Sequence, residues 1–207
     1  MDESFAKLTL KEKLNFSDED LEKLSIFTNF LINKNISHNF IAKTTEGQMW
    51  SRHILDSAQL VKFIDFTDVG SLADLGSGAG FPGIVLAIFN KNQNFHVKLY
   101  EKSPLKSKFL SSIKEKLDLK VIIHGGNYQE HIIDSKYIVA RAFKKLPEII
   151  KISREKAEKT HKLIVLKGKN AQEEAEIALK GQNIKYKLEA SMTEKDSKIL
   201  IIDFVKK

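Results

Sequence analysis

A glycine-rich segment is the first feature of this sequence that could serve chemistry. Residues 73–83 read ADLGSGAGFPG and contain Gly76, Gly78, Gly80 and Gly83, although the whole 207-residue chain has only ten glycines. Glycine permits a sharp turn and lets a ligand lie directly against the backbone. The segment is flanked by a strand-like run and a helix-like run, which argues against a flexible linker. We therefore expect a loop that binds a nucleoside-type cofactor.

Two cofactor-binding patterns overlap in this loop. Gly78, Gly80 and Gly83 match the G-x-G-x-x-G pattern of dinucleotide-binding folds, which is a weak signal by itself. Asp74, followed by three alternating glycines that begin at Gly76, instead resembles the first motif of class I S-adenosylmethionine-dependent methyltransferases. The second register is favoured because its glycines start directly at the strand end and its acid lies inside that strand end.

A carboxylate further along the chain fits either cofactor. Both cofactors carry a ribose, whose hydroxyl groups an acid at the end of the second strand would bind. Glu101 ends the strand-like run FHVKLYE and stands 21 residues after Gly80. A solvated acid without a ligand is the plain alternative. The pairing of glycine loop and carboxylate favours ribose binding.

Composition limits the chemistry that this chain can perform. There is no cysteine, which excludes disulfides, thiolate metal sites and cysteine nucleophiles, and no spacing of His, Asp and Glu indicates a metal site. No apolar run reaches about 18 residues, the length needed to span a membrane. The acidic N-terminus does not resemble a signal peptide. We expect a cytoplasmic protein without membrane association.

The charge of the chain is unevenly distributed. The net charge is +7, yet residues 1–70 carry 8 Lys+Arg and 11 Asp+Glu, whereas residues 71–207 carry 26 and 16. A basic C-terminal part suits a polyanionic partner such as nucleic acid. Lysine supplies 31 of the 34 basic residues, so a general lysine bias would explain the excess equally well.

The elements that must position these residues follow from the hydrophobic pattern. Ser17, with Asp20 three residues later, predicts the start of a helix, residues 33–47 look like a loop, and residues 48–66 give a second helical pattern. From residue 71, seven short apolar runs alternate with charged helical runs, and no helix separates the last two. This order predicts an α/β fold with a mainly parallel sheet and a C-terminal hairpin. We expect an N-terminal helical extension, residues 1–70, and a Rossmann-like domain, residues 71–207.

Four short sequence motifs along the chain match one protein family. Residues 52–57 read RHILDS, residues 76–83 read GSGAGFPG, residues 141–143 read RAF, and residues 166–168 read LKG. In this order the sequence resembles the small-subunit (16S) ribosomal RNA guanine-N7 methyltransferases, historically called glucose-inhibited division protein B, over nearly the whole chain. The resemblance implies the class I methyltransferase fold, S-adenosyl-L-methionine as cofactor, and 16S ribosomal RNA of the small ribosomal subunit as partner. We expect a monomer.

The resemblance also implies roles for particular residues. Gly76 and Phe81 would line the methionine and sulfonium part of the cofactor, and Glu101 would hold the ribose. Asn127 and Tyr128 would flank the adenine, at a place where relatives tend to carry an acid. The full set of expected cofactor-binding residues is Asp74, Gly76, Gly78, Gly80, Phe81, Glu101, Asn127, Tyr128 and Arg141.

Arg141 stands apart because the chain contains only three arginines. A planar guanidinium can form forked or stacked contacts that lysine cannot, and the resemblance places Arg141 where cofactor and guanine meet, as the expected catalytic residue. For Arg52 and Asp56, a simple helical ion pair is an equal alternative to a substrate role. His53 is expected to be packed or hydrogen-bonded rather than catalytic. The expected RNA-binding residues are Arg52, Lys102, Lys106, Lys144 and Lys167.

The residues are consistent with methylation of guanine N7 even without the family. Methylation at a pyrimidine ring carbon generally needs a cysteine, which is absent, and the Asn/Asp-Pro-Pro-aromatic motif of many amine methyltransferases is replaced by ARAF at residues 140–143. The N7 lone pair is free at neutral pH, so its methylation needs no general base. Positioning alone can supply about 7–11 kcal/mol of a barrier.

Three other functions remain open from the sequence. An NAD(P)-dependent oxidoreductase would use the register from Gly78 to Gly83. A non-catalytic ribosomal RNA-binding assembly protein would bind RNA with a steep salt dependence but transfer no methyl group. A small-molecule methyltransferase would not need the basic C-terminal part.

Overall fold

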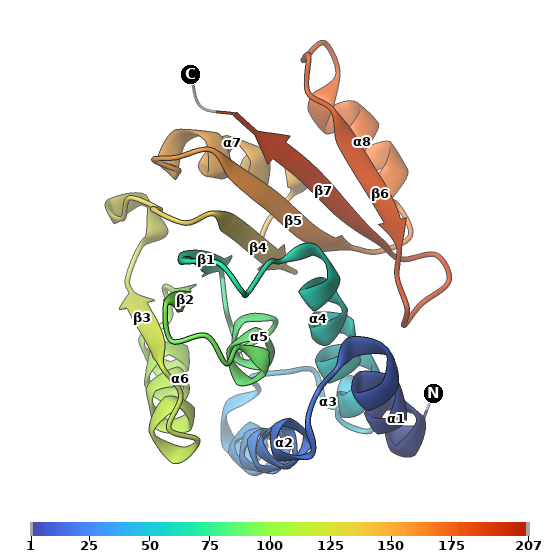
Figure 1. The fold of residues 1–207 in the computed structure, drawn as a ribbon, viewed down its shortest axis with the longest axis vertical. Coiled ribbons are helices and arrows are strands. Elements are labelled where there is room, and N and C mark those ends of the chain that lie inside the picture. Colours follow the sequence, from blue (N-terminus) through green and yellow to red (C-terminus); the bar gives the residue numbers. More distant parts are fainter. Residues whose placement is uncertain (1, 206–207) are drawn as a thin grey trace.

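Seven strands form one sheet, in the order β3-β2-β1-β4-β5-β7-β6, in a computed structural model that describes residues 2–205 (Figure 1). Neighbours among the first five strands run parallel, and β7 runs antiparallel to both β5 and β6. This confirms the predicted, mainly parallel sheet with a C-terminal antiparallel pair. The strands are β1 (Gly70–Leu75), β2 (Phe95–Glu101), β3 (Val121–Gly125), β4 (Tyr137–Arg141), β5 (His161–Lys167), β6 (Tyr186–Ala190) and β7 (Lys198–Phe204).

Helices cover both faces of the sheet. Side chains of β1 alternate between two hydrophobic clusters, Leu72 belonging to one and Ala73 and Leu75 to the other. Because β1 is buried on both faces, its sequence is apolar without a clean alternation of polar residues. The cluster around Leu72 includes α5 (Gly83–Phe89) and α6 (Pro104–Lys116), and the other includes α7 (Leu146–Lys156) and α8 (Ala171–Leu179).

The N-terminal helices add a further layer on the side of α5 (Figure 1). The ring centroids of Phe27 and Phe81 are 5.3 Å apart, and those of Phe16 and Phe89 are 4.9 Å apart. These contacts join the N-terminal helices to the glycine loop and to α5. The segments are α1 (Glu3–Leu14), α2 (Asp18–His38), α3 (Lys43–Glu46), the π-helical turn η1 (Met49–Leu55), α4 (Asp56–Ala58) and the 3-10 helix η2 (Gln59–Phe63).

The N-terminal helices also show where the sequence pattern was followed and where it was not. The predicted start of α2 is confirmed, since the Ser17 and Asp20 side chains form a complete capping box. The predicted loop over residues 33–47 is wrong in its first part, because α2 continues to His38 and ends at Asn39 in the left-handed conformation. α1 was not predicted, because only Ala6, Thr9, Leu10 and Leu14 of its twelve residues are buried.

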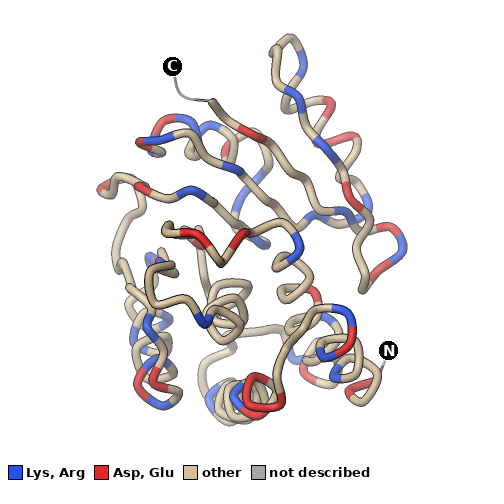
Figure 2. The backbone as a smooth tube through the Cα atoms, viewed as in Figure 1, with Lys and Arg blue, Asp and Glu red and all other residues tan. Residues whose placement is uncertain are grey.

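Charged residues are spread over many elements of the fold rather than gathered on one surface (Figure 2). Acidic residues gather at the start of α2, where Asp18, Glu19 and Asp20 follow one another, whereas β5 carries two lysines, Lys162 and Lys167 (Figure 2). Within residues 2–205, no helix is both long and apolar enough to cross a membrane.

Candidate active site

A large cavity lies at the carboxyl ends of the central strands. Its volume is about 880 Å³, which is within the usual range for ligand pockets. Its walls come from the glycine loop after β1, the end of β2, the loop after β3, the segment after β4, and the region between α2 and η1. The strand order reverses between β2 and β4 around β1, so the cavity lies at the switch point where open α/β sheets bind ligands.

The glycine loop turns through backbone conformations that side chains disfavour. Gly76 has φ +73°, and a Cβ atom there would lie 2.2 Å from Cδ2 of Phe143. Gly76 is therefore required both by its own backbone and by the Phe143 ring that lies against it. Gly76 and Gly78 both line the cavity, as expected.

Gly80 and Asp74, two of the expected cofactor-binding residues, do not line the cavity and pack behind the glycine loop. A Cβ atom at Gly80 would approach Ile84 Cγ1 to 2.7 Å and Phe27 Cζ to 3.2 Å, so this glycine allows α2 and α5 to pack closely. Asp74 is fully buried, and its Oδ2 accepts a hydrogen bond of 2.9 Å from the Gly83 N–H. Burial raises the pKa of Asp74 to about 7. Both residues support the loop from below.

Glu101 closes the loop from the neighbouring strand. Its Oε2 accepts a hydrogen bond of 2.8 Å from Gly78 N–H, and its Oε1 accepts one of 2.8 Å from Ser103 N–H. A carboxylate has about four acceptor positions, so two remain for a ligand. The side chain lines the cavity, at the position where a ribose is expected.

An aromatic pair from the segments after β3 and β4 also lines the cavity. The rings of Tyr128 and Phe143 meet edge to face with centroids 5.5 Å apart. Asn127 caps the short 3-10 helix η3 (Tyr128–Glu130) by accepting a hydrogen bond from Gln129 N–H. Asn127, Tyr128 and Phe143 all line the cavity, together with Phe81.

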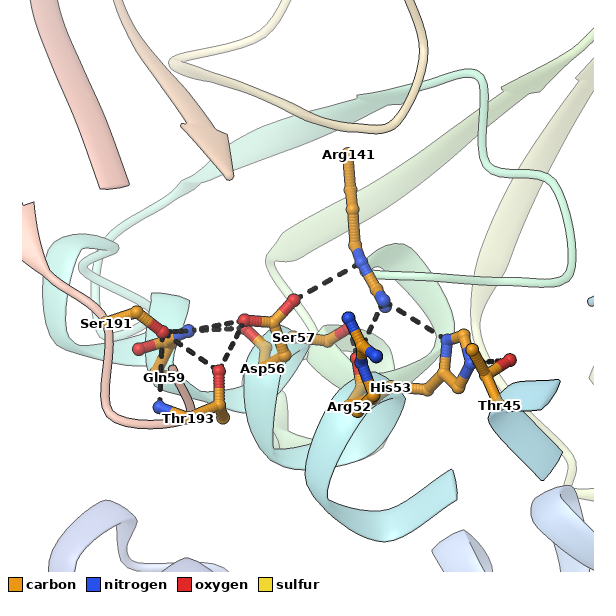
Figure 3. Close-up of polar contacts among 9 residues, drawn as sticks. All are labelled: Thr45, Arg52, His53, Asp56, Ser57, Gln59, Arg141, Ser191 and Thr193. Carbon is orange, nitrogen blue, oxygen red and sulfur yellow. Dashed lines mark hydrogen bonds and ion pairs between the residues drawn. The ribbon is translucent and has the colours of Figure 1, made fainter. Parts of the chain in front are cut away.

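Arg141 is held by one short segment of the N-terminal region (Figure 3). Its Nη2 donates to the Arg52 carbonyl oxygen at 2.7 Å and to His53 Nδ1 at 3.2 Å. Its Nε lies 3.3 Å from Asp56 Oδ2. Its Nη1 is buried and has no hydrogen-bond partner within residues 2–205. The guanidinium is thus fixed in place by contacts through Nη2 and Nε.

These contacts determine the protonation of His53. Arginine only donates, so His53 Nδ1 must accept, and the ring proton sits on Nε2, which lies 2.9 Å from Thr45 Oγ1 and donates to it. Burial, followed by the charges of Arg141 and Arg52, lowers the pKa of His53 to about 4. His53 is therefore neutral at pH 7 and orients Arg141, consistent with the expected non-catalytic role.

Asp56 connects Arg141 to the turn between β6 and β7. Its Oδ1 accepts hydrogen bonds from Gln59 Nε2 at 2.9 Å and from Thr193 Oγ1 at 3.0 Å (Figure 3). Burial raises the pKa of Asp56, and the charge of Arg141 opposes that shift. Asp56 does not form the ion pair with Arg52 that helical spacing suggested. Asp56 pairs instead with Arg141, a partner that helical spacing does not reveal.

The family model described as GidB, rRNA small subunit methyltransferase G, matches residues 20–201. The chain belongs to this family. A relative named ribosomal RNA small subunit methyltransferase G from Pelagibacter ubique is 35% identical over 212 aligned positions, covering 100% of this chain and 99% of the relative. One of the same name from Rickettsia prowazekii is 34% identical, covering 92% and 97%.

Solved structures agree on the fold of this GidB family member. A SAM-dependent methyltransferase from Aquifex aeolicus has a TM-score of 0.59 at 13% identity and covers 79% of this chain and 96% of that one. Fibrillarin from Aeropyrum pernix, solved with natively bound S-adenosyl-L-methionine, has a TM-score of 0.53 at 9% identity and covers 67% and 68%. The chain is thus a methyltransferase with the SAM-dependent fold, and the dinucleotide register is disfavoured.

The basic residues expected to bind RNA in this GidB family member are only partly gathered. Lys102, Lys106 and Lys144 line the large cavity. Lys167 lines a smaller cavity beside it and forms an ion pair of 2.6 Å with Glu174. The exposed Arg52 side chain makes no hydrogen bond or ion pair within residues 2–205, and its carbonyl oxygen is the atom that contacts Arg141.

Within residues 2–205, no group of three His, Asp or Glu side chains is placed to hold an ion.

Proposed function

We propose that this chain transfers a methyl group from S-adenosyl-L-methionine to N7 of a guanine in 16S ribosomal RNA. The arrangement around Arg141 supports the site. Three sequence motifs of the family, namely residues 52–57, the glycine loop and residues 141–143, meet there at one cavity. The names of the relatives support ribosomal RNA of the small subunit as the substrate. We further propose that the enzyme works as a monomer in the cytoplasm.

The residues of the large cavity fit the cofactor. Gly76 and Gly78 present bare backbone to it, and Glu101 keeps acceptor positions free for ribose hydroxyls. Phe81 and the Tyr128–Phe143 pair supply apolar surface for the methionine chain and the adenine. When bound there, S-adenosyl-L-methionine supplies a methyl group activated by its sulfonium charge.

The protein's part in the reaction is positioning without proton transfer. The N7 lone pair forms the new N–C bond as the S–C bond breaks, the positive charge moves from sulfur to guanine, and no proton leaves. Arg141 is paired with Asp56, and His53 is neutral. These three side chains therefore add little net positive charge that would repel the positively charged methylated guanine. The site would accelerate the reaction mainly by holding the two reactants in line.

The proposal is tested by methyl transfer from labelled cofactor to naked 16S ribosomal RNA and to small ribosomal subunits, with the product located by cleavage at 7-methylguanine. We expect labelling of one guanine by the wild-type protein. Arg141→Ala should lower the transfer rate by about 100-fold or more, since small misplacements cost that much. Arg154→Ala is the matched control, because Arg154 contacts only Gln182 through its guanidinium among the described residues.

Each outcome separates the candidate functions. RNA binding by the wild-type protein without methyl transfer would favour a non-catalytic assembly protein. Transfer to a ring carbon or an exocyclic amine would remove the N7 assignment. Full activity of a folded Arg141→Ala variant would remove Arg141 from the site.

A further inference from the structure

A second cavity lies directly beside the large one. Its volume is about 260 Å³, and it is formed at the carboxyl ends of β4 and β5, the start of β7 and the turn before β7. Arg141, Ala142 and Lys144 line both cavities. A group in the second cavity would therefore stand next to whatever occupies the first.

The second cavity is strongly basic. Arg141, Lys144, Lys167 and Lys198 line it, with Asp56 as its single acid. Lys144 and Lys167 are held by Glu148 and Glu174 outside the cavity lining. The Lys198 side chain forms no ion pair or hydrogen bond within residues 2–205, so its ammonium group is open to an anionic ligand.

The position of Lys198 points to a bound anion. In the antiparallel pairing of β5 and β7, Lys167 lies directly opposite Lys198. Glu174 pairs with Lys167, so Lys198 is the ammonium group of this pair that has no carboxylate partner among the described residues, and it would attract a bound anion. Ser197 lines the same cavity, so a hydroxyl donor is available beside the two ammonium groups.

We propose that the second cavity is a nucleotide subsite for the RNA substrate, in which Lys167 and Lys198 bind a phosphate next to the target guanine. This inference rests on the proposed function. A phosphodiester carries the negative charge that would pair with Lys198 in this cavity. The two cavities share a wall. A nucleotide whose phosphate lies in the second cavity would therefore place its own base, or the base of the next nucleotide, beside the methyl donor in the large cavity.

The first test reverses one charge. Lys198→Glu should weaken binding of a short single-stranded RNA by about tenfold or more, as expected for losing a charge-assisted hydrogen bond. The slope of log affinity against log salt should fall by about 1. Affinity for S-adenosylhomocysteine should not change. Lys120→Glu is the control, because Lys120 precedes β3 at the opposite end of the sheet.

The second test blocks the cavity without changing charge. Gly168 lines the second cavity, its φ is not positive, and a Cβ atom there would meet nothing within 4 Å. Gly168→Leu should therefore fold and bind S-adenosylhomocysteine normally but raise the KM for RNA severalfold or more. Gly47→Leu is the matched control, since Gly47 has equal space, also lacks a positive φ, and lies outside this cavity.

Binding of guanosine monophosphate and of inorganic phosphate to the protein saturated with S-adenosylhomocysteine separates the possible outcomes. Lys198-dependent binding of guanosine monophosphate supports the subsite, even if methyl transfer fails and the proposed function falls. Unchanged RNA affinity and KM in Lys198→Glu, with an active wild-type enzyme, would overturn the inference alone. Equal binding of inorganic phosphate, with no effect on RNA, would show a free-anion site and would also overturn it.

Discussion

Glu101 is the residue whose predicted role is most directly open to measurement. Both of its oxygens already accept backbone hydrogen bonds that shape the glycine loop, and their remaining acceptor positions face the cavity. Glu101→Ala should weaken S-adenosylhomocysteine binding by about tenfold or more, since hydrogen bonds to charged groups contribute about 1.5–3 kcal/mol each. Calorimetric titration would measure this, with Glu115→Ala as control on the exposed face of α6. Unchanged affinity would place the ribose elsewhere.

His53 gives the fold a pH dependence of known sign. Its pKa falls from 6.5 in the unfolded chain to about 4 in the folded protein. Between these values the unfolded chain binds more protons, so this residue lowers the free energy of unfolding as pH falls from about 6.5 towards 4. Asp74, whose pKa is raised to about 7, acts in the opposite direction over much of the same range.

The contribution of His53 can be isolated by difference. The difference in stability between the wild-type protein and His53→Gln should shift in favour of the variant as pH falls from about 6.5 to 4, because glutamine takes up no proton. Urea unfolding at several pH values would measure it. Parallel curves for the two proteins would contradict the low pKa.

At the scale of elements, the glycine loop lies where the sheet, α5 and α2 pack against one another. Gly80 has φ +100°, and a side chain there would strike Ile84 of α5 and Phe27 of α2. Gly80→Ala should lower the free energy of unfolding by about 2 kcal/mol or more, from backbone strain and overpacking together. Gly47→Ala, with open space and no positive φ, should change it by less than about 0.5 kcal/mol. Thermal or urea unfolding would compare the two, and equal stability would show that the loop can relax.

The segment from η1 to η2 is the second element that matters for the site. It passes through π-helical, α-helical and 3-10 geometry within residues 49–63. The Asp56 N–H bonds to the His53 carbonyl rather than to Arg52 four residues back. The Arg52 carbonyl can then accept the Arg141 Nη2, while His53 and Asp56 contact the same guanidinium. A regular helix would present these three groups differently.

At the scale of the molecule, the N-terminal helices and the sheet share one hydrophobic cluster. Leu24, Phe27 and Leu31 of α2 belong to the same cluster as Val97 and Leu99 of β2. We propose that the N-terminal extension, residues 1–70, folds together with residues 71–207 rather than alone. The single tryptophan, Trp50, reports on the extension, since it is buried in η1.

Cooperative folding predicts that two probes coincide. Urea transitions followed by Trp50 fluorescence and by far-ultraviolet circular dichroism should share one midpoint, because the extension and the sheet lose a common core together. Separate midpoints would show that the extension unfolds independently. Adding S-adenosylhomocysteine at 100 times its dissociation constant should shift both probes equally, by about 2.7 kcal/mol.

The local pattern of the sequence determined much of the fold and part of the site. The strand run FHVKLYE matched β2 to the residue, because its first five residues alternate between apolar and polar, the period of a strand. The glycine loop and Glu101 were found because a turn at a strand end and an acid at the next strand end are local signals. The extent of α2 past residue 33 was missed, because tertiary packing extended a helix whose last turn is polar.

The tertiary structure alone decided how the site is assembled. Arg52 lies 89 positions before Arg141, and Thr193 lies 137 positions after Asp56. Pairings over such distances leave no periodic trace, because they depend on how folded layers meet rather than on the spacing within one element. The same holds for the packing of Asp74 against Gly83 and of Gly80 against Ile84 and Phe27, which the sequence pattern does not reveal. Residue types fixed the chemistry available to this protein, and only packing fixed which atoms face the cavity.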